Sequence, residues 1–360
     1  MKKICTVVGA RPQFIKLSMV SRVLRKNFQE VLIHTGQHFD SNMSDIFFEE
    51  MTIPRPDYNL GISGGTHGKM TGQMLEKLEE VLLKERPDML LIFGDTNSTL
   101  AGALAAVKLG IPVCHVEAGC RLGSLRNPEE VNRIVADHIS ALHLACTASC
   151  VDFLKREGFS DSVHLVGDPM YDAFCYYSVR LDGTELEGLT DLDGQPVTLP
   201  PRFYYLTCHR QENTDTDEKL EEIFRAMNML DAPVIYPVHP RNRERALRLY
   251  QPHGSRSLIL TQPVGYQTSI SLVNRAEKII TDSGGLQREA FFAQKPCVTV
   301  FDYVVWQETM AHSCNQLASP KAADILEKLN APVFFDPAYQ PFGDGHAATK
   351  IVEEIQNFFG

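Results

Sequence analysis

The 360-residue chain lacks any long hydrophobic run: none of its apolar stretches approaches the roughly 20 residues of a membrane-spanning helix. A signal peptide is not expected either, because Met1-Lys-Lys leads into a short strand-like segment rather than a long apolar core with a cleavage site. Positive charge is in deficit, with 35 lysines and arginines against 45 acidic residues, which argues against nucleic acid or an anionic membrane surface as partner. We therefore expect a cytoplasmic protein whose ligand is a small molecule.

Paired cysteines are also missing. The nine cysteines are scattered and none forms a C-x-x-C pair, while Cys146 and Cys150 have no matching set of His or Cys partners. We interpret them as free thiols in a reducing compartment and expect no structural zinc site.

What the chain does have is regular alternation of short apolar strands with helical stretches, over a length that suits two domains of about 150 to 200 residues. This alternation predicts an α/β protein whose parallel sheets are covered on both faces. A Gly- and Asp-rich stretch, Leu181–Pro201, reads as a long surface loop, and the crossover between domains is expected near Gly167–Tyr171. The expected strands are Ile4–Val8, Val31–His34, Met89–Phe93, Val113–Val116, Leu142–Ala145, Val163–Val166, Phe203–Thr207, Val234–Pro237, Leu258–Leu260, Lys278–Thr281 and Cys297–Val300; the expected helices include Phe14–Leu24, Thr71–Leu83, Ser98–Leu109 and Ala347–Phe358.

Polar and glycine clusters follow seven of these strands. In doubly wound domains ligands bind beyond the carboxyl ends of the strands, so these clusters, which come from both halves, predict one cleft between two facing domains. They begin at Gly9, Thr35, Gly94, Glu117, Cys208, His239 and Asp282.

The most informative cluster is Ile280-Thr-Asp-Ser-Gly-Gly-Leu-Gln-Arg-Glu289, a strand that ends in a Ser-Gly-Gly turn before a helix. Glycines let a ligand oxygen approach the backbone, and the N–H groups at a helix start favour an anion. Glu289 would lie roughly one turn into that helix, where it could accept hydrogen bonds from ribose hydroxyls.

Charged residues in the first half allow two interpretations each. Arg11 could reach a phosphate in fork geometry, with Lys16 in the same helix, or the two could be a solvated helix-start pair. Asp95 and Glu117 each close an apolar strand, so partial desolvation would suit them to proton transfer, although Asp95 could instead cap a helix that begins near Thr96. Glu129 follows Pro128 and, taken alone, reads as part of a stable helix start.

The histidines also allow more than one interpretation. His209 follows a strand and could donate to a phosphate oxygen or act as an acid near neutral pH. A nucleophilic Cys208–His209 pair is the rival, but adjacent strand residues point to opposite faces. His239 and His115 are as readily structural as functional.

Taken together, these segments resemble the UDP-N-acetylglucosamine 2-epimerases of the non-hydrolysing bacterial type, over almost the whole chain. The matching segments occur in family order: Gly9-Ala-Arg-Pro-Gln-Phe-Ile-Lys16, Gly94-Asp-Thr96, His115-Val-Glu-Ala-Gly119, Pro128-Glu-Glu-Val-Asn-Arg133, His209-Arg-Gln-Glu-Asn213, Pro237-Val-His239, Asp282-Ser-Gly-Gly-Leu-Gln-Arg-Glu-Ala290 and Gly343-Asp-Gly345.

The resemblance implies a glycosyltransferase-B-like fold of two Rossmann-like domains facing a central cleft, residues 1–168 and 169–345, with the helix at 346–360 packing back on the first. It implies epimerisation at C2 of a UDP-N-acetyl sugar by elimination and re-addition of UDP through a 2-acetamidoglucal, with no metal or redox cofactor and, as a family expectation, a homodimer. The implied catalytic residues are Asp95, Glu117, Glu129 and His209; the implied substrate- and UDP-binding residues are Arg11, Lys16, Gln37, Arg133, Arg210, Glu212, Asn213, His239, Ser283, Gly284, Gly285, Glu289 and Glu308.

The chain departs from the family pattern at several positions. Where the family has R-D-x-T-E-R-P-E, this chain has Phe301-Asp-Tyr-Val-Val-Trp-Gln-Glu308, and Arg288 stands where an acid is usual. The allosteric substrate site of part of the family would use Gln37 and His239, which are present, together with a glutamine where Asp40 stands and an arginine where Gln211 stands. We therefore expect activation by UDP-GlcNAc to be absent or altered.

Residues 9–16 followed by 35–45 also resemble a subgroup that acts on UDP-2,3-diacetamido-glucuronic acid. The C6 carboxylate of that sugar would require a further cationic side chain in the site, and Arg121 or Arg126 could provide it. Three other functions stay open: a glycosyltransferase, a hydrolysing epimerase and a non-catalytic UDP-sugar sensor. A transferase or a sensor would not explain three carboxylates and a histidine together.

Overall fold

The computed structural model describes residues 1–37, 47–183, 186, 188–250 and 258–360. Contacts divide the chain into two compact units: unit 1 holds residues 1–175 and 340–360, and unit 2 holds residues 176–339, so that the division falls inside helix α7 (Pro169–Leu181). Among the described residues, no helix is both long enough and apolar enough to cross a membrane.

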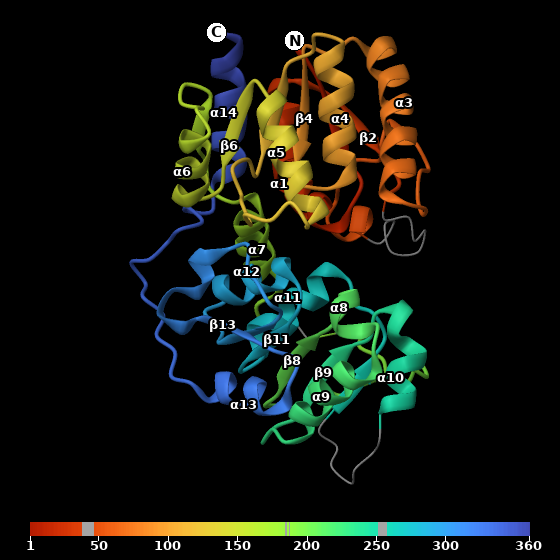
Figure 1. Ribbon diagram of the computed structural model, residues 1–360, viewed down its shortest axis with the longest axis vertical. Helices are drawn as coiled ribbons and strands as arrows, with labels where there is room; N and C mark the ends of the chain where they lie inside the picture. The colour runs from red at the N-terminus through yellow and green to blue at the C-terminus, as the bar shows by residue number, and fades with distance from the viewer. Residues whose placement is uncertain (38–46, 184–185, 187, 251–257) are drawn as a thin grey trace. The chain divides into compact units, whose positions relative to one another are not determined.

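Unit 1 is a parallel seven-stranded sheet in the order β3-β2-β1-β4-β5-β6-β7. Helices α3, α4 and α5 follow one another along one face, whereas α1 packs against α14 on the other (Figure 1). The strands are β1 (Lys3–Val8), β2 (Gln29–His34), β3 (Tyr58–Asn59), β4 (Met89–Phe93), β5 (Val113–Val116), β6 (Leu142–Ala145) and β7 (Val163–Leu165). Besides α7, the helices are α1 (Arg11–Asn27), α3 (His67–Glu85), α4 (Asn97–Lys108), α5 (Pro128–Ile139), α6 (Ala148–Arg156) and α14 (Ala347–Phe359).

Helix α14 is held to unit 1 at both ends. The buried Asp172 carboxylate accepts hydrogen bonds from the amides of Ala347 (3.0 Å) and Ala348 (2.7 Å), which satisfies two N–H groups at the start of the helix. At the other end the rings of Phe28 and Phe359 lie 6.1 Å apart. The last residues of the chain therefore belong to the hydrophobic packing of unit 1.

Unit 2 is a parallel six-stranded sheet in the order β10-β9-β8-β11-β12-β13. Its strands are β8 (Tyr204–Thr207), β9 (Val234–Pro237), β10 (Leu258–Thr261), β11 (Ile279–Thr281), β12 (Cys297–Val300) and β13 (Asn315–Ala318); its helices are α8 (Gln211–Thr214), α9 (Asp217–Asn228), η1 (Pro240–Asn242), α10 (Arg243–Leu249), α11 (Tyr266–Arg275), α12 (Gly284–Phe292), η2 (Gln307–Ser313) and α13 (Ala322–Asn330).

Both sheets have the Rossmann order, with a topological switch point between β1 and β4 in unit 1 and between β8 and β11 in unit 2. The predicted fold class of two doubly wound parallel-sheet domains is confirmed. Each unit buries its own apolar core, and nearly every side chain of β1, β4, β5 and β11 is buried, as expected for strands covered on both faces.

Two strands were not predicted. Strand β3 has only two residues, too few to show alternation, and β13 has the sequence Asn-Gln-Leu-Ala, which lacks an apolar run. The stretch predicted as a loop, 181–201, is confirmed as irregular in its described residues after α7, where only isolated bridges such as Thr190 with Pro196 occur.

One buried histidine makes the stability of unit 1 depend on pH. His143 on β6 lies 2.9 Å from the Ser162 hydroxyl and 2.7 Å from the Asp137 carbonyl oxygen, and burial lowers its pKa below the ordinary value. The folded state therefore prefers neutral His143, while the unfolded chain binds a proton near pH 6.5. Stability should be fully present above about pH 6.5 and fall as the pH drops below it. Thermal unfolding followed by circular dichroism from pH 7.5 to 5 should show a shallower fall for His143→Gln; an equal fall in both proteins would contradict the assignment.

Candidate active site

The carboxyl ends of β1 and β5 in unit 1 bring together two of the predicted residues. Lys16, in the second turn of α1, forms an ion pair with Glu117, which follows β5, and the two residues are 2% and 8% exposed. The interpretation of Lys16 as a solvated helix-start residue is therefore wrong, and the predicted desolvation of Glu117 is confirmed. Arg11, at the start of the same helix, places its guanidinium 4.7 Å from the centre of the Phe47 ring.

Glu117 has an unusual backbone conformation. Its φ is 73°, the left-handed region that non-glycine residues rarely adopt, and its amide donates to the Leu144 carbonyl at 3.0 Å. The turn after β4 passes close to the Glu117 side chain, because a Cβ built on Gly94 would lie 3.7 Å from Oε1 of Glu117 and 3.4 Å from the Lys16 ammonium nitrogen. Strained non-glycine residues of this kind cluster at functional sites.

Asp95, which follows Gly94, is held by helix α5. Its carboxylate lies 2.5 Å from an Arg133 guanidinium nitrogen, and its carbonyl oxygen accepts from the Asn132 amide at 2.9 Å. The alternative that Asp95 caps α4 is wrong, because the Thr96 side chain occupies the cap position and accepts from the Thr99 amide. Asp95 is thus an ion-paired carboxylate with a side chain 26% exposed.

Helix α5 begins with the two acidic residues that the sequence indicated, but they have different surroundings. Glu129 is exposed in the first turn. Glu130, which sequence reasoning did not single out, is buried and accepts from the amides of Leu122 and Gly123 and from Arg133 (3.0 Å). Glu130 therefore fixes the loop before α5 and the arginine that holds Asp95, while Glu129 is the one open to a ligand.

Three buried groups near Lys16 have the residue types of a metal site: the side chains of Glu117, Cys146 and Asp168 approach one another within 4.8 Å. The Lys16 ammonium already supplies a cation to this cluster. Burial, with Asp168 and Glu117 nearby, also raises the pKa of the Cys146 thiol well above its ordinary value, so that the thiolate a metal would need is disfavoured. The donor set does not fit a resident metal ion.

Gln37 and the two arginines proposed for a sugar carboxylate can also be placed. The Gln37 side chain accepts from the Ser98 amide (3.0 Å) and hydroxyl (2.8 Å), which ties it to the start of α4; Asp40 lies outside the described residues. Arg121 contacts Asp137 and Glu157, each at 2.7 Å, and its side chain is 5% exposed. Arg121 is therefore committed to structure, whereas Arg126 is exposed.

In unit 2 the segment after β8 is organised by one buried carboxylate, Asp282, which lies directly after β11. Asp282 accepts from the backbone amides of His209 and Arg210, each at 2.9 Å, and lies 3.2 Å from the Nδ1 atom of His209. The imidazole is thereby oriented with Nδ1 toward Asp282. Burial raises the pKa of Cys208 well above its ordinary value, so a nucleophilic Cys208–His209 pair is contradicted.

The other residues of this segment differ in exposure. Asn213 is buried and donates to the Val300 carbonyl at 2.7 Å, which ties α8 to the end of β12, and Glu212 is exposed. Arg210 lies 4.6 Å from the centre of the Phe301 ring and donates to the Tyr303 hydroxyl at 3.2 Å. Phe301 and Tyr303 belong to the stretch where the sequence departs from the family pattern, so that stretch contributes to the position of Arg210.

The predicted strand-turn-helix unit is present between β11 and α12. Ser283 caps α12 and accepts from the Leu286 amide, and a Cβ on Gly284 would meet no atom within 4 Å, so the backbone there is open to a ligand. Glu289 is buried in the second turn. Glu308, in η2, is 9% exposed.

Two further side chains of unit 2, His239 and Arg288, each lie beside a ring. The ring of His239 is stacked on that of His209 with their centres 6.2 Å apart, and its Nδ1 accepts from the Arg241 amide. Arg288, the residue that stands where an acid is usual, is 3% exposed and lies 4.1 Å from the centre of the Trp306 ring.

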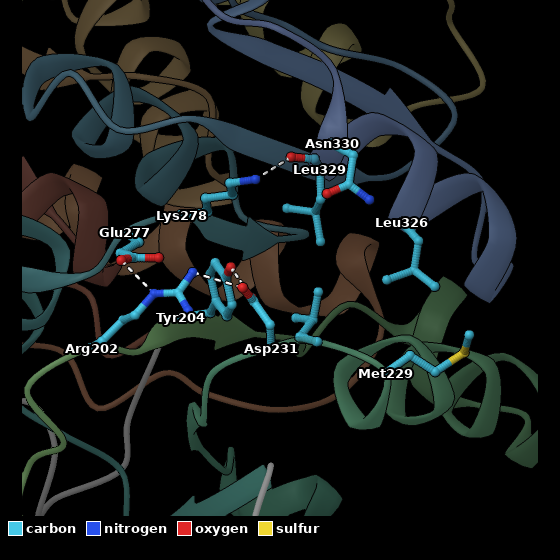
Figure 2. Close-up of a pocket in the computed structure, with 10 residues that line it drawn as sticks. Arg202, Tyr204, Met229, Asp231, Glu277, Lys278, Leu326, Leu329 and Asn330 are labelled. Carbon is cyan, nitrogen blue, oxygen red and sulfur yellow. Dashed lines mark hydrogen bonds and ion pairs between the residues drawn. The ribbon is translucent and has the colours of Figure 1, made fainter.

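A pocket of about 340 Å³ lies at the opposite, amino end of the unit 2 sheet (Figure 2). Arg202 donates to Glu277 (2.7 Å) and to Asp231 (2.9 Å), and the Tyr204 hydroxyl donates to Asp231 (2.7 Å). Lys278 also lines the pocket, so its two cations balance its two carboxylates, and the pocket is remote from the strand ends where the predicted residues gather.

Comparison with known proteins gives full-length similarities. The profile of the family described as UDP-N-acetylglucosamine 2-epimerase matches residues 22–356. A UDP-N-acetylglucosamine 2-epimerase homolog of Methanococcus maripaludis is 44% identical, over 99% of this chain and 99% of its own. A UDP-2,3-diacetamido-2,3-dideoxy-D-glucuronate 2-epimerase of Pseudomonas aeruginosa is also 44% identical, over 98% of this chain and 99% of its own. The crystal structure of Methanocaldococcus jannaschii UDP-GlcNAc 2-epimerase in complex with UDP-GlcNAc and UDP is similar, with a TM-score of 0.88 and 37% identity over 99% of each chain.

Proposed function

Because this chain belongs to the UDP-N-acetylglucosamine 2-epimerase family, we propose that it is a non-hydrolysing enzyme that interconverts UDP-GlcNAc and UDP-ManNAc. The observation that carries the proposal is the pair of carboxylates at the strand ends of unit 1, Glu117 with Lys16 and Asp95 with Arg133. Each is held at a fixed place by a cation, as proton transfer at a defined carbon requires.

The reaction has to overcome the low acidity of the C2 proton. The C1–O bond to UDP breaks as a carboxylate takes the proton from C2, and the electron pair of the C–H bond becomes the C1–C2 double bond of a 2-acetamidoglucal. UDP then adds back to C1 while a proton returns to the other face of C2. Asp95, Glu117 and Glu129 are the proposed proton-transfer groups, without assignment of one residue to each face.

Unit 2 supplies groups suited to the departing diphosphate. Negative charge grows on the leaving oxygen, so donors already fixed in position stabilise it most. His209, oriented by Asp282, and the amides that follow Ser283 are the proposed donors. Glu289 is the proposed partner of the ribose hydroxyls, and Arg11 is a proposed phosphate contact.

A second substrate, the UDP-2,3-diacetamido uronic acid, is favoured by one observation: the Pseudomonas aeruginosa relative is as similar to this chain as the Methanococcus maripaludis relative. With Arg121 committed to Asp137 and Glu157, Arg126 is the candidate cation for its C6 carboxylate. The proposal also includes a cytoplasmic location, where UDP-sugars are made, and a homodimer on the family expectation, which light scattering of the purified protein tests.

Proton NMR of the protein with UDP-GlcNAc in deuterium oxide tests the function. We expect UDP-ManNAc with deuterium at C2, because the proton that returns comes from a carboxylate in exchange with solvent. Free ManNAc would instead indicate a hydrolysing epimerase. No turnover of UDP-GlcNAc, followed by turnover of the diacetamido uronic acid sugar, would establish the second substrate, and no turnover of either would contradict the proposal.

A further inference from the structure

Asp137, near the end of α5, is fully buried and lies among the turns that carry the proposed catalytic carboxylates. Its Oδ1 lies 2.6 Å from Nδ1 of His115, and its Oδ2 accepts from the Gly119 amide (3.0 Å) and from Arg121 (2.7 Å). Burial alone would raise the pKa of Asp137, but the interactions with His115 and Arg121 lower it below its ordinary value. Asp137 is therefore an ionised carboxylate with a hydrogen-bonding or ion-pair partner at each of its two oxygens.

His115 extends this arrangement to the turn that carries Asp95. Its Nε2 lies 2.7 Å from the Gly94 carbonyl oxygen. A carbonyl oxygen can only accept, so Nε2 bears a proton, and Nδ1 faces a carboxylate that also accepts. The imidazole thus links one oxygen of Asp137 to the peptide that joins Gly94 to Asp95.

The other oxygen of Asp137 fixes the turn that carries Glu117. Gly119 has a φ of 83°, and a Cβ there would lie 2.3 Å from the Cys150 carbonyl oxygen, so only glycine fits where this turn packs against α6. The hydrogen bond from Gly119 to Asp137 lies two residues from Glu117, whose own φ is also positive.

We infer that Asp137 is a positioning residue that sets the distance between the turn of Asp95 and the turn of Glu117. Its Oδ1 holds the Asp95 turn through His115, and its Oδ2 holds the Glu117 turn through the Gly119 amide. The inference rests on the proposed function of those two residues. Asp137 does not touch the substrate, and acts only through His115 and the Gly119 amide. Because a displacement of about 1 Å at a reacting centre can cost roughly 100-fold in rate, loss of this link should appear in kcat rather than in nucleotide binding.

Asp137→Asn tests the inference with little change in shape. An asparagine oxygen can still accept from Gly119 and Arg121, so the variant should fold, but the NH₂ group that replaces Oδ1 cannot accept from Nδ1–H of His115, which breaks the link to Gly94. We expect kcat for C2 epimerisation to fall about 10- to 100-fold. The KM for the UDP-sugar and the Kd for UDP, measured by calorimetry, should change less than about twofold, because the proposed nucleotide contacts lie mainly in unit 2.

Glu30→Gln is the matched control. Glu30 is also a buried carboxylate of unit 1 that contacts an arginine (Arg25, 2.6 Å) and accepts from Thr6 (2.8 Å), but it sits at the amino end of β2. It should lower the melting temperature as much as Asp137→Asn while kcat stays within about twofold of wild type. Equal losses of kcat in the two variants would assign Asp137 a merely structural role.

His115→Asn provides an independent variant if Asp137→Asn does not fold. It removes the link to Gly94 but leaves Asp137 bonded to Gly119 and Arg121, and we expect a loss of kcat with KM unchanged. The double variant should be no slower than the slower single one, because both substitutions break one path; additive losses would overturn the inference. Wild type that fails to exchange C2 would instead refute the proposed function, which keeps the two failures apart.

Discussion

Replacing Glu117 with glutamine is expected to lower kcat at least about 100-fold, the loss typical of a group in proton transfer. The same substitution leaves the Lys16 ammonium buried without its charged partner, which should cost about 3–5 kcal/mol of stability. Steady-state kinetics and thermal unfolding of the same preparation measure both effects. Asp95→Asn and Glu129→Gln carry the same expectation for kcat.

The double variant Lys16→Met/Glu117→Gln separates catalysis from folding. Methionine fills much of the same space without a charge, so most of the lost stability should return, while kcat should stay as low as in Glu117→Gln because no carboxylate is restored. Recovery of activity together with stability would show that Glu117 acts only through the fold. A single variant Glu117→Gln that keeps its fold and stays within tenfold of wild-type kcat would return Glu117 to a structural role.

The sequence predicted the strands and the residues after them because both depend on local pattern. Strands such as Met89–Phe93 are apolar runs that end in Gly-Asp, and a doubly wound sheet brings such ends to one edge. The partners of those residues could not be predicted in the same way. Lys16 and Glu117 are separated by about 100 residues, and only the order β1-β4-β5 brings them together.

Asp282 and Asp137 each contact several site residues, and for both the partners depend on long-range packing that the sequence does not reveal. Asp282 stands inside the strand-turn-helix motif, so its place beside the ligand turn was visible, but its bonds to His209 and Arg210 depend on the pairing of β8 with β11. Asp137 gave no local signal, since an aspartate late in a helix is ordinary. The buried role of Glu130 could not be predicted for a similar reason: Glu129 and Glu130 are adjacent, and which of them is buried depends on how α5 packs on the sheet.

His209→Asn is expected to lower kcat about 100- to 1,000-fold with little effect on UDP affinity. The imidazole is the proposed donor to the departing diphosphate, and removal of one such preorganised donor typically costs this much. The backbone amides of His209 and Arg210 would remain bonded to Asp282, so the segment after β8 should keep its shape. His312→Asn is the matched control in the same unit, because His312 is exposed and has a φ of 53°, a conformation that asparagine tolerates.

Asp282→Asn should behave differently, and the contrast tests the role assigned to each residue. The carboxylate accepts from two backbone amides and faces Nδ1 of His209, whereas an asparagine would turn an NH₂ group toward at least one of these donors. An unsatisfied buried donor costs about 1–3 kcal/mol of stability, so the segment that carries His209 and Arg210 should lose its fixed conformation, and UDP affinity should fall along with kcat. Calorimetry with UDP distinguishes the two variants. If His209→Asn weakens UDP binding as much as Asp282→Asn does, the imidazole acts in ground-state binding and not mainly on the leaving group.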